Sequence, residues 1–133
     1  MLILLLALMQ VPGSRLHVDL QDLRTDKGVV YCALFRDANS WQKPDKALKT
    51  AKASIERTSA VCEFPDLSPG TYAVSTYHDE NGNGKLDTNF IGKPKEGTGA
   101  SNDAKGSMGP PKFDGAKFDL DTRDKSIVIH MSY

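Results

Sequence analysis

The chain has 133 residues, which is enough for one domain with a hydrophobic core but not for two. Apolar residues make up 39% and charged residues 26% of it, a composition that excludes an intrinsically disordered chain. The 17 basic and 17 acidic residues balance without forming a basic stripe, so we do not expect nucleic acid as a partner. Eleven glycines and seven prolines favour an all-β fold with many turns.

The first segment, residues 1–14, is expected to be separate from the domain. Residues 1–9 (MLILLLALM) are almost continuously apolar but too few to span a bilayer, which takes about 20 residues. Such a run is typical of a secretory signal peptide, although no positively charged residue precedes it. A buried first strand is the alternative, but β-branched residues are scarce here. We therefore expect an exported protein, periplasmic or extracellular, with a domain at 15–133 and no membrane span.

The rest of the chain reads as strands separated by turns. Apolar and polar residues alternate along several short segments, and β-branched and aromatic residues are frequent in them. We expect a single antiparallel β-sandwich with one short helix within 41–48 and strands at 16–23, 29–35, 54–57, 59–64, 72–76, 118–120 and 126–133. The remaining long segment, 88–117, is rich in Gly, Pro, Ser and Asn, and we expect an ordered loop there.

The two cysteines lie in predicted strands. Alternation places Glu63 outward and therefore Cys62 inward, and Cys32 shares the inward face of its strand with Val30 and Leu34. A disulfide between them would contribute roughly 2–4 kcal/mol. Two buried free thiols are the alternative. An exported protein meets an oxidising compartment, which favours the bridge.

The segment 78–87 (HDENGNGKLD) has the spacing of a calcium-binding loop, D-x-[DN]-x-[DN]-G. Gly84 stands where such a loop needs positive φ. Calcium takes carboxylate, amide and carbonyl oxygens. The candidate ligands are Asp79, Asn81, Asn83, Asp87 and the backbone carbonyl of Lys85. The sequence therefore predicts a calcium site in this loop.

The loop departs from an EF-hand because Phe90 stands where a bidentate Glu would close the shell. Side chains from the long loop are candidates to close it instead, namely Glu96, Asp103 and Asp114. In the alternative interpretation, 81–84 (NGNG) forms two hairpin turns that need no metal, with the flanking aspartates capping them.

Two resemblances extend this interpretation. The pattern F-x-x-L-x-P-G-x-Y-x-V at 64–74 resembles the one in transthyretin-like β-sandwiches such as collagen-adhesin B-type repeats. The longer run HDENGNGKLDTNFIGKPKEGTGASN, followed by GPPKFDGAKF, resembles the bacterial secreted family called domain of unknown function 2141. That resemblance covers residues 16–133 and implies an exported, sandwich-like bacterial domain. Thr98 and Ala100 stand where the family leads us to expect aromatic residues.

These observations predict a non-enzymatic domain that binds calcium for structure. Its partner would be a protein, a glycan or a small ligand bound at loop 88–117. One alternative is a small-ligand or carbohydrate-binding module whose pocket that loop lines. Another is a hydrolase that uses His78 and nearby carboxylates, in which case the histidine should have a strongly shifted pKa.

Overall fold

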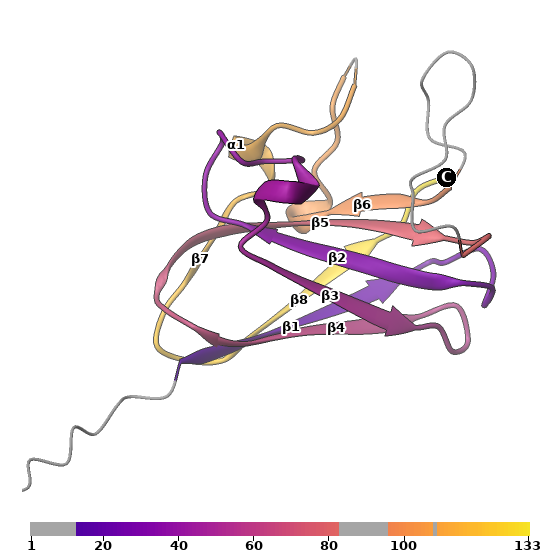
Figure 1. The fold of residues 1–133 in the computed structure, drawn as a ribbon, viewed down its shortest axis with the longest axis horizontal. Helices are drawn as coiled ribbons and strands as arrows, with labels where there is room; N and C mark the ends of the chain where they lie inside the picture. The colour runs from indigo at the N-terminus through magenta and orange to yellow at the C-terminus, as the bar shows by residue number, and fades with distance from the viewer. Residues whose placement is uncertain (1–12, 83–95, 108) are drawn as a thin grey trace, which may run out of the picture.

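The computed structural model describes residues 13–82, 96–107 and 109–133. In these residues the chain forms two β-sheets that pack face to face (Figure 1). The first sheet has the order β4-β1-β8, with β1 at Ser14–Gln21, β4 at Ala60–Leu67 and β8 at Lys125–His130. The second sheet has the order β3-β2-β5-β6, and β7 also pairs with β5. The bounds of these strands are Val29–Phe35 for β2, Lys49–Ser54 for β3, Gly70–Asp79 for β5, Thr98–Ala100 for β6 and Phe118–Leu120 for β7. The predicted all-β sandwich is confirmed, and a transthyretin-like fold is compatible with it at this coarse level.

Three predictions need correction: the position of one strand, the type of one helix and the direction of one strand pair. The short strand expected at 54–57 is instead β3 at Lys49–Ser54, and the helix expected within 41–48 is only the 3-10 turn η1 at Pro44–Lys46. One strand pair is parallel, because β1 runs alongside β8 in the same direction, whereas every other named pair is antiparallel. The alternation of side chains does not reveal strand direction, so the sequence pattern could not distinguish the two arrangements.

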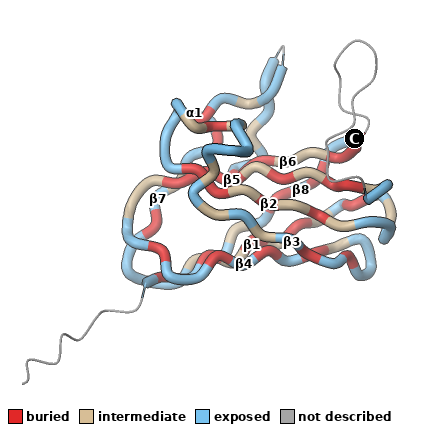
Figure 2. Tube along the Cα trace, in the orientation of Figure 1, coloured by how far each residue is buried: buried red, intermediate tan, exposed pale blue. Residues whose placement is uncertain are grey.

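The main core lies between the two sheets. Buried and more exposed residues alternate along β1 (Figure 2). Leu16, Val18 and Leu20 are the buried ones and lie on the inward face of the strand. They meet inward residues of the opposite sheet, including Val30, Leu34, Tyr72 and Val74. Burying apolar side chains of this kind contributes about 1.5–3 kcal/mol each, which makes this layer the main source of stability.

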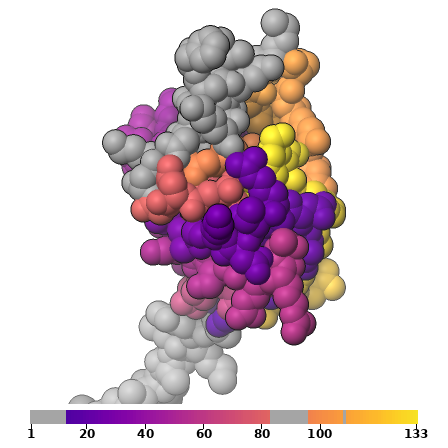
Figure 3. Space-filling model, turned by 90° about the vertical axis from the view of Figure 1, so that its right-hand side faces the viewer, coloured from indigo at the N-terminus to yellow at the C-terminus, as the bar shows by residue number. Residues whose placement is uncertain are grey.

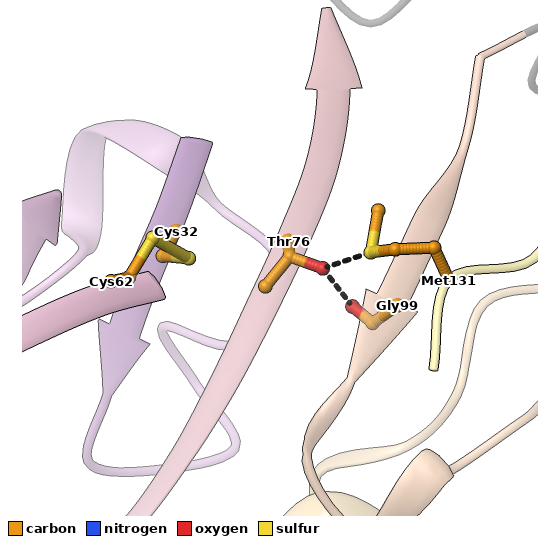
Figure 4. Close-up of a disulfide and its surroundings, with 5 residues drawn as sticks. All are labelled: Cys32, Cys62, Thr76, Gly99 and Met131. Carbon is orange, nitrogen blue, oxygen red and sulfur yellow. Dashed lines mark hydrogen bonds between the residues drawn. A yellow bond between two sulfur atoms is a disulfide. The ribbon is translucent and has the colours of Figure 1, made fainter. Parts of the chain in front are cut away.

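A disulfide crosses this core. Cys32 of β2 and Cys62 of β4 are bonded, and their Cα atoms are 6.5 Å apart. The bond joins the two sheets, because β2 belongs to one and β4 to the other (Figure 4). Both residues are almost fully buried.

A second apolar cluster covers part of the outer face of the β3-β2-β5-β6 sheet. Trp41 and Phe113 pack edge to face there, and the Trp41 Nε1–H donates to the Pro111 carbonyl at 2.8 Å. The cluster rests on Phe35 and Ala73 of the sheet. Its upper layer comes from the predicted long loop, whose described part contains β6, η2 (Ser101–Asp103) and α1 (Phe113–Ala116). This part of 88–117 is therefore packed onto the sandwich.

One open side of the sandwich is joined by backbone hydrogen bonds. Thr98 of β6 and Ser132, which follows β8, exchange two N–H···O bonds of 2.9 Å each. The two sheets are thus linked along this side, and the end of the chain is held beside the end of β5 (Figure 1). The candidate site lies where the end of β5, the start of β6 and the end of the chain come together.

Candidate functional site

The predicted metal loop begins where β5 ends. His78 and Asp79 are the last two residues of β5, and both are fully buried. After residue 82, the described part of the chain resumes at Glu96. The backbone N–H of His78 donates to the carbonyl of the next residue, Gly97, at 2.8 Å. The end of β5 and the residues that precede β6 are therefore held side by side.

Glu96 brings a second carboxylate to this point. Its side chain is only 5% exposed, and its Oε2 accepts a hydrogen bond of 2.7 Å from the backbone N–H of Glu80. Since Glu80 directly follows Asp79, two buried carboxylates lie at the base of the loop. Oxygen atoms held in this way are the ligands that calcium prefers.

The other predicted ligands fall into two groups. Asn81 is exposed and directly follows this base, whereas the ligands expected at Asn83, Lys85 and Asp87 lie outside the described residues. Among 13–82, 96–107 and 109–133, no three His, Cys, Asp or Glu side chains come together as a metal-binding group.

Asp103 and Asp114, predicted as additional ligands, lie elsewhere in the structure. The Asp103 carboxylate binds the backbone N–H and Nδ1 of His130, both at 2.8 Å. Asp114 is exposed and pairs with Lys117 at 3.2 Å. The cause is the packing of η2 and α1 on the middle of β5, where Ser101 Oγ accepts the Val74 N–H. Val74 is five residues before Asp79, or about 16 Å along a strand.

The His78 ring is fully engaged in hydrogen bonds. One ring nitrogen, Nε2, lies 2.6 Å from the Lys27 carbonyl, and the other, Nδ1, lies 2.6 Å from the Tyr133 hydroxyl. A carbonyl only accepts, so Nε2–H is the donor to Lys27, and Nδ1 makes the second hydrogen bond with the Tyr133 hydroxyl. Both ring nitrogens therefore have hydrogen-bond partners within the protein.

Arg24 and Glu80 complete this group. Arg24 Nη2 lies 2.5 Å from Glu80 Oε1, and its guanidinium carbon lies 4.6 Å from the centre of the Tyr133 ring. The Arg24 backbone N–H also donates to the Tyr133 hydroxyl at 3.1 Å. Burial raises the pKa of Tyr133 and the Glu80 charge adds to this, against the opposing effect of Arg24. The hydroxyl of Tyr133 therefore keeps its proton beside His78.

Sequence reasoning missed Arg24 and Tyr133. Tyr133 does continue the alternation of Ile127, Ile129 and Met131, which was a signal that it lies on the same side of the chain as they do. Arg24 follows the first strand and carried no local signal. In Figure 3 the segments that contribute these residues, coloured indigo, salmon and yellow, meet at one end of the molecule.

The described residues define the class of protein: a β-sandwich with two buried carboxylates, those of Asp79 and Glu96, at the end of β5. A family model described as an uncharacterized protein conserved in bacteria (DUF2141) matches residues 18–128. The chain therefore belongs to the DUF2141 family, as its resemblance led us to expect. Comparison with curated proteins and with solved structures gave no match.

In the described part of the chain, no helix is long and apolar enough to cross a membrane.

Proposed function

We propose that this protein is an exported, non-enzymatic β-sandwich that binds one calcium ion in the loop between Asp79 and Glu96. The observation that carries the proposal is the position of Glu96. Its buried carboxylate lies against the backbone that follows Asp79, held by the 2.7 Å bond from Glu80 N–H. In this proposal, Glu96 serves as the closing carboxylate that the loop motif lacks.

The number of oxygen ligands fits calcium. Asp79 and Glu96 supply carboxylates at the base, and the motif adds the side chains of Asn81, Asn83 and Asp87 and the carbonyl of residue 85. Calcium takes six to eight oxygens, so a monodentate contact from each gives the lower bound. A site with so few carboxylates would bind calcium with a Kd of roughly 10⁻⁴–10⁻³ M, as extracellular modules do.

Two further observations support the other parts of the proposal. The apolar residues 1–9 and the Cys32–Cys62 disulfide both fit an exported protein in an oxidising compartment. The hydrogen bonds on both His78 nitrogens argue against that residue as a general base. The expected partner at loop 88–117 stays a prediction.

The test is thermal unfolding of the chelator-treated full chain with and without calcium. A ligand that binds only the folded state stabilises it, and at about 10 mM calcium a Kd near 1 mM adds about 1.4 kcal/mol to the free energy of unfolding. For a domain of this size, we expect Tm to rise by roughly 5 °C. Magnesium at the same concentration controls for ionic strength.

Two matched substitutions identify the site. Asp87→Asn removes a predicted ligand charge and should abolish most of the calcium-dependent rise in Tm. Asp114→Asn makes the same change at an exposed carboxylate in α1 that pairs with Lys117, and should leave the rise intact. A wild-type Tm that calcium does not change, or an equal loss in both variants, would refute the proposal.

A further inference from the structure

We propose that the outer face of the β3-β2-β5-β6 sheet binds a short acidic oligosaccharide, one whose sugars carry carboxylate groups. The binding site is formed by Tyr31, Gln42, Lys52 and Tyr77 and is here called the tyrosine shelf. None of these residues is a proposed calcium ligand, so the inference does not depend on calcium binding.

The centre of the tyrosine shelf is a pair of aromatic rings. Tyr31 of β2 and Tyr77 of β5 lie opposite each other in the sheet, and their rings stack with centroids 5.1 Å apart. Both residues are half-buried, so the pair is partly accessible from solvent. Tyrosine combines an apolar ring with a polar hydroxyl, which makes it frequent at binding surfaces. A sugar ring has the matching surface, because its C–H groups are apolar and its rim carries hydroxyls.

Polar groups beside the rings are available to a ligand. Ser75, which shares the outer face of β5 with Tyr77, donates its Oγ–H to Gln42 Oε1 at 2.7 Å. This bond holds the Gln42 side chain against the sheet. Among residues 13–82, 96–107 and 109–133, neither the Gln42 amide nitrogen nor the Tyr31 hydroxyl has a hydrogen-bond partner. Both groups can therefore bond to sugar hydroxyls without giving up a bond within the protein.

The backbone of Gln42 is strained. Its φ is 64°, in the left-handed region that residues other than glycine rarely adopt. Glycine would adopt this conformation at little cost. Strain of this kind is concentrated at ligand-binding sites, where the position of a side chain matters more than stability. At Gln42 the side chain that the strained backbone carries is the one that places an amide nitrogen on the shelf.

The exposed charge on this face is positive. Where β3, β2 and β5 pair, the outer face carries two charged residues: Lys52, which is exposed, and Asp79, which is fully buried. Lys52 is opposite Tyr31 in the sheet, and its Nζ lies 5.9 Å from the centre of the Tyr31 ring. The adjoining segment 36–48 adds three exposed basic residues and two exposed acidic ones, namely Arg36, Lys43, Lys46, Asp37 and Asp45. A ligand that carries carboxylates complements this charge.

A nucleic acid would also be attracted by this charge, but the two rings offer it little. Bases bind to single-strand-binding proteins by stacking on the faces of aromatic rings. Because β2 lies between β3 and β5, one face of Tyr31 is turned to Lys52 and the other to Tyr77. A sugar can instead contact the ring edges and hydroxyls. The arrangement therefore favours an acidic oligosaccharide over a nucleic acid.

The test is an NMR titration of the isotope-labelled full chain with a short oligogalacturonate, followed through the backbone amide shifts. The buffer contains a chelator, so that calcium cannot bridge the ligand carboxylates to the protein. We expect the amides around Tyr31 and Tyr77 to shift and saturate, and those of β4 to stay unchanged. A neutral oligogalactose of the same length should bind roughly 5-fold more weakly, because it has no carboxylate for Lys52.

Three variants locate the site. Lys52→Gln removes one charge from the shelf and should raise the Kd roughly 5-fold. Lys125→Gln is the matched control, because Lys125 begins β8 in the other sheet, and it should leave the Kd unchanged. Gln42→Gly removes the amide but suits the left-handed backbone, so it should raise the Kd roughly 5-fold while Tm does not fall. A loss of affinity without a loss of stability distinguishes a binding residue from a structural one.

Several results would overturn the proposal. One is the absence of a saturable shift with oligogalacturonate, and another is a set of shifts confined to other surfaces. A Kd that is equal for the neutral oligosaccharide, or a wild-type Kd in Lys52→Gln or Gln42→Gly, would do the same. Tighter binding of a thymidine oligonucleotide at the same amides would make the shelf a nucleic-acid site instead. Because the titration contains no calcium, a failure of the proposed calcium site leaves these outcomes unaffected.

Discussion

His130 of β8 and Asp103 of η2 meet in a two-point contact on the surface. The Asp103 carboxylate accepts the His130 backbone N–H at one oxygen and faces Nδ1 at the other. The hydrogen bond and the charge of Asp103 raise the pKa of His130 above its ordinary value. Burial raises the pKa of Asp103, but the bonds from His130 outweigh this effect, so its pKa lies below the ordinary value.

The sign of the pH dependence follows from these two shifts. The raised pKa of His130 means that its contribution is complete below about pH 6.5 and is lost as pH rises through the folded-state pKa. The lowered pKa of Asp103 means that its contribution is present above about pH 3.9 and is lost as pH falls through the folded-state pKa. The contact is therefore strongest between these limits and weakens toward alkaline pH.

We predict that Asp103→Asn returns the pKa of His130 toward about 6.5. The imidazole proton shifts of His130, followed by NMR across pH, measure it directly. Asp121→Asn is the control, because Asp121 pairs with Arg123 on another part of the surface. An unchanged His130 pKa in Asp103→Asn, or an equal fall in both variants, would contradict the assignment.

At the residue scale, the sequence predicted the features that repeat at regular spacing along a strand or a loop. Alternation placed Cys32 and Cys62 inward, and the even spacing of oxygen-bearing residues pointed to Asp79. Glu96 was named as a ligand only among several candidates, since nothing local distinguishes it from Asp114. Tyr133 meets Arg24 across more than a hundred residues, and such a contact exists only once the fold has formed.

Among the elements, β6 shows most clearly how small side chains allow close packing. Its middle residue, Gly99, lies against three atoms of the core: a Cβ there would lie 2.6 Å from Ile129 Cγ2, 3.0 Å from Thr76 Oγ1 and 3.2 Å from Met131 Sδ. Thr76 contacts both Gly99 and Met131 (Figure 4). A Cβ at Gly99 would therefore require at least one of these side chains to shift.

We predict that Gly99→Ala lowers the free energy of unfolding by about 1–3 kcal/mol, the usual effect of overpacking a core. Gly70→Ala is the matched control. Gly70 begins β5, and the nearest atom to a Cβ there is Tyr72 Cε2 at an ordinary 3.8 Å. Urea unfolding of both variants measures the difference. Equal stability of Gly99→Ala and the wild type would show that β6 can move away from β8.

The predicted boundaries of elements were accurate where the local sequence pattern was strong. The strongly β-prone run 29–35 and the short strand 118–120 have the predicted bounds as β2 and β7. β6 and α1 were missed, because a strand of Thr, Gly and Ala and a single turn of helix carry no periodic signal. The strand expected at 54–57 was displaced because that stretch forms the turn between β3 and β4, closed by the Glu56–Ser59 bridge.

On the scale of the whole molecule, the sandwich is held by links between its two sheets as well as by its core. The Thr98–Ser132 bonds join the sheets along one side. Across the core, the Cys32–Cys62 bond joins β2 to β4. The sequence predicted the disulfide but not the Thr98–Ser132 hydrogen bonds. Those bonds join backbone groups that every residue carries, so the side chains of the two residues give no signal of them.

The disulfide gives the last prediction. It connects residues 30 positions apart, and closing a loop of that length in the unfolded chain corresponds to roughly 3–4 kcal/mol of stability. Cys32→Ala/Cys62→Ala should therefore lower the free energy of unfolding by about that amount in oxidising buffer. In reducing buffer the wild-type chain should lose most of this advantage, leaving only the packing of two buried thiols. The measurement is guanidinium unfolding of both proteins under both conditions, and equal stability of the two in oxidising buffer would contradict it.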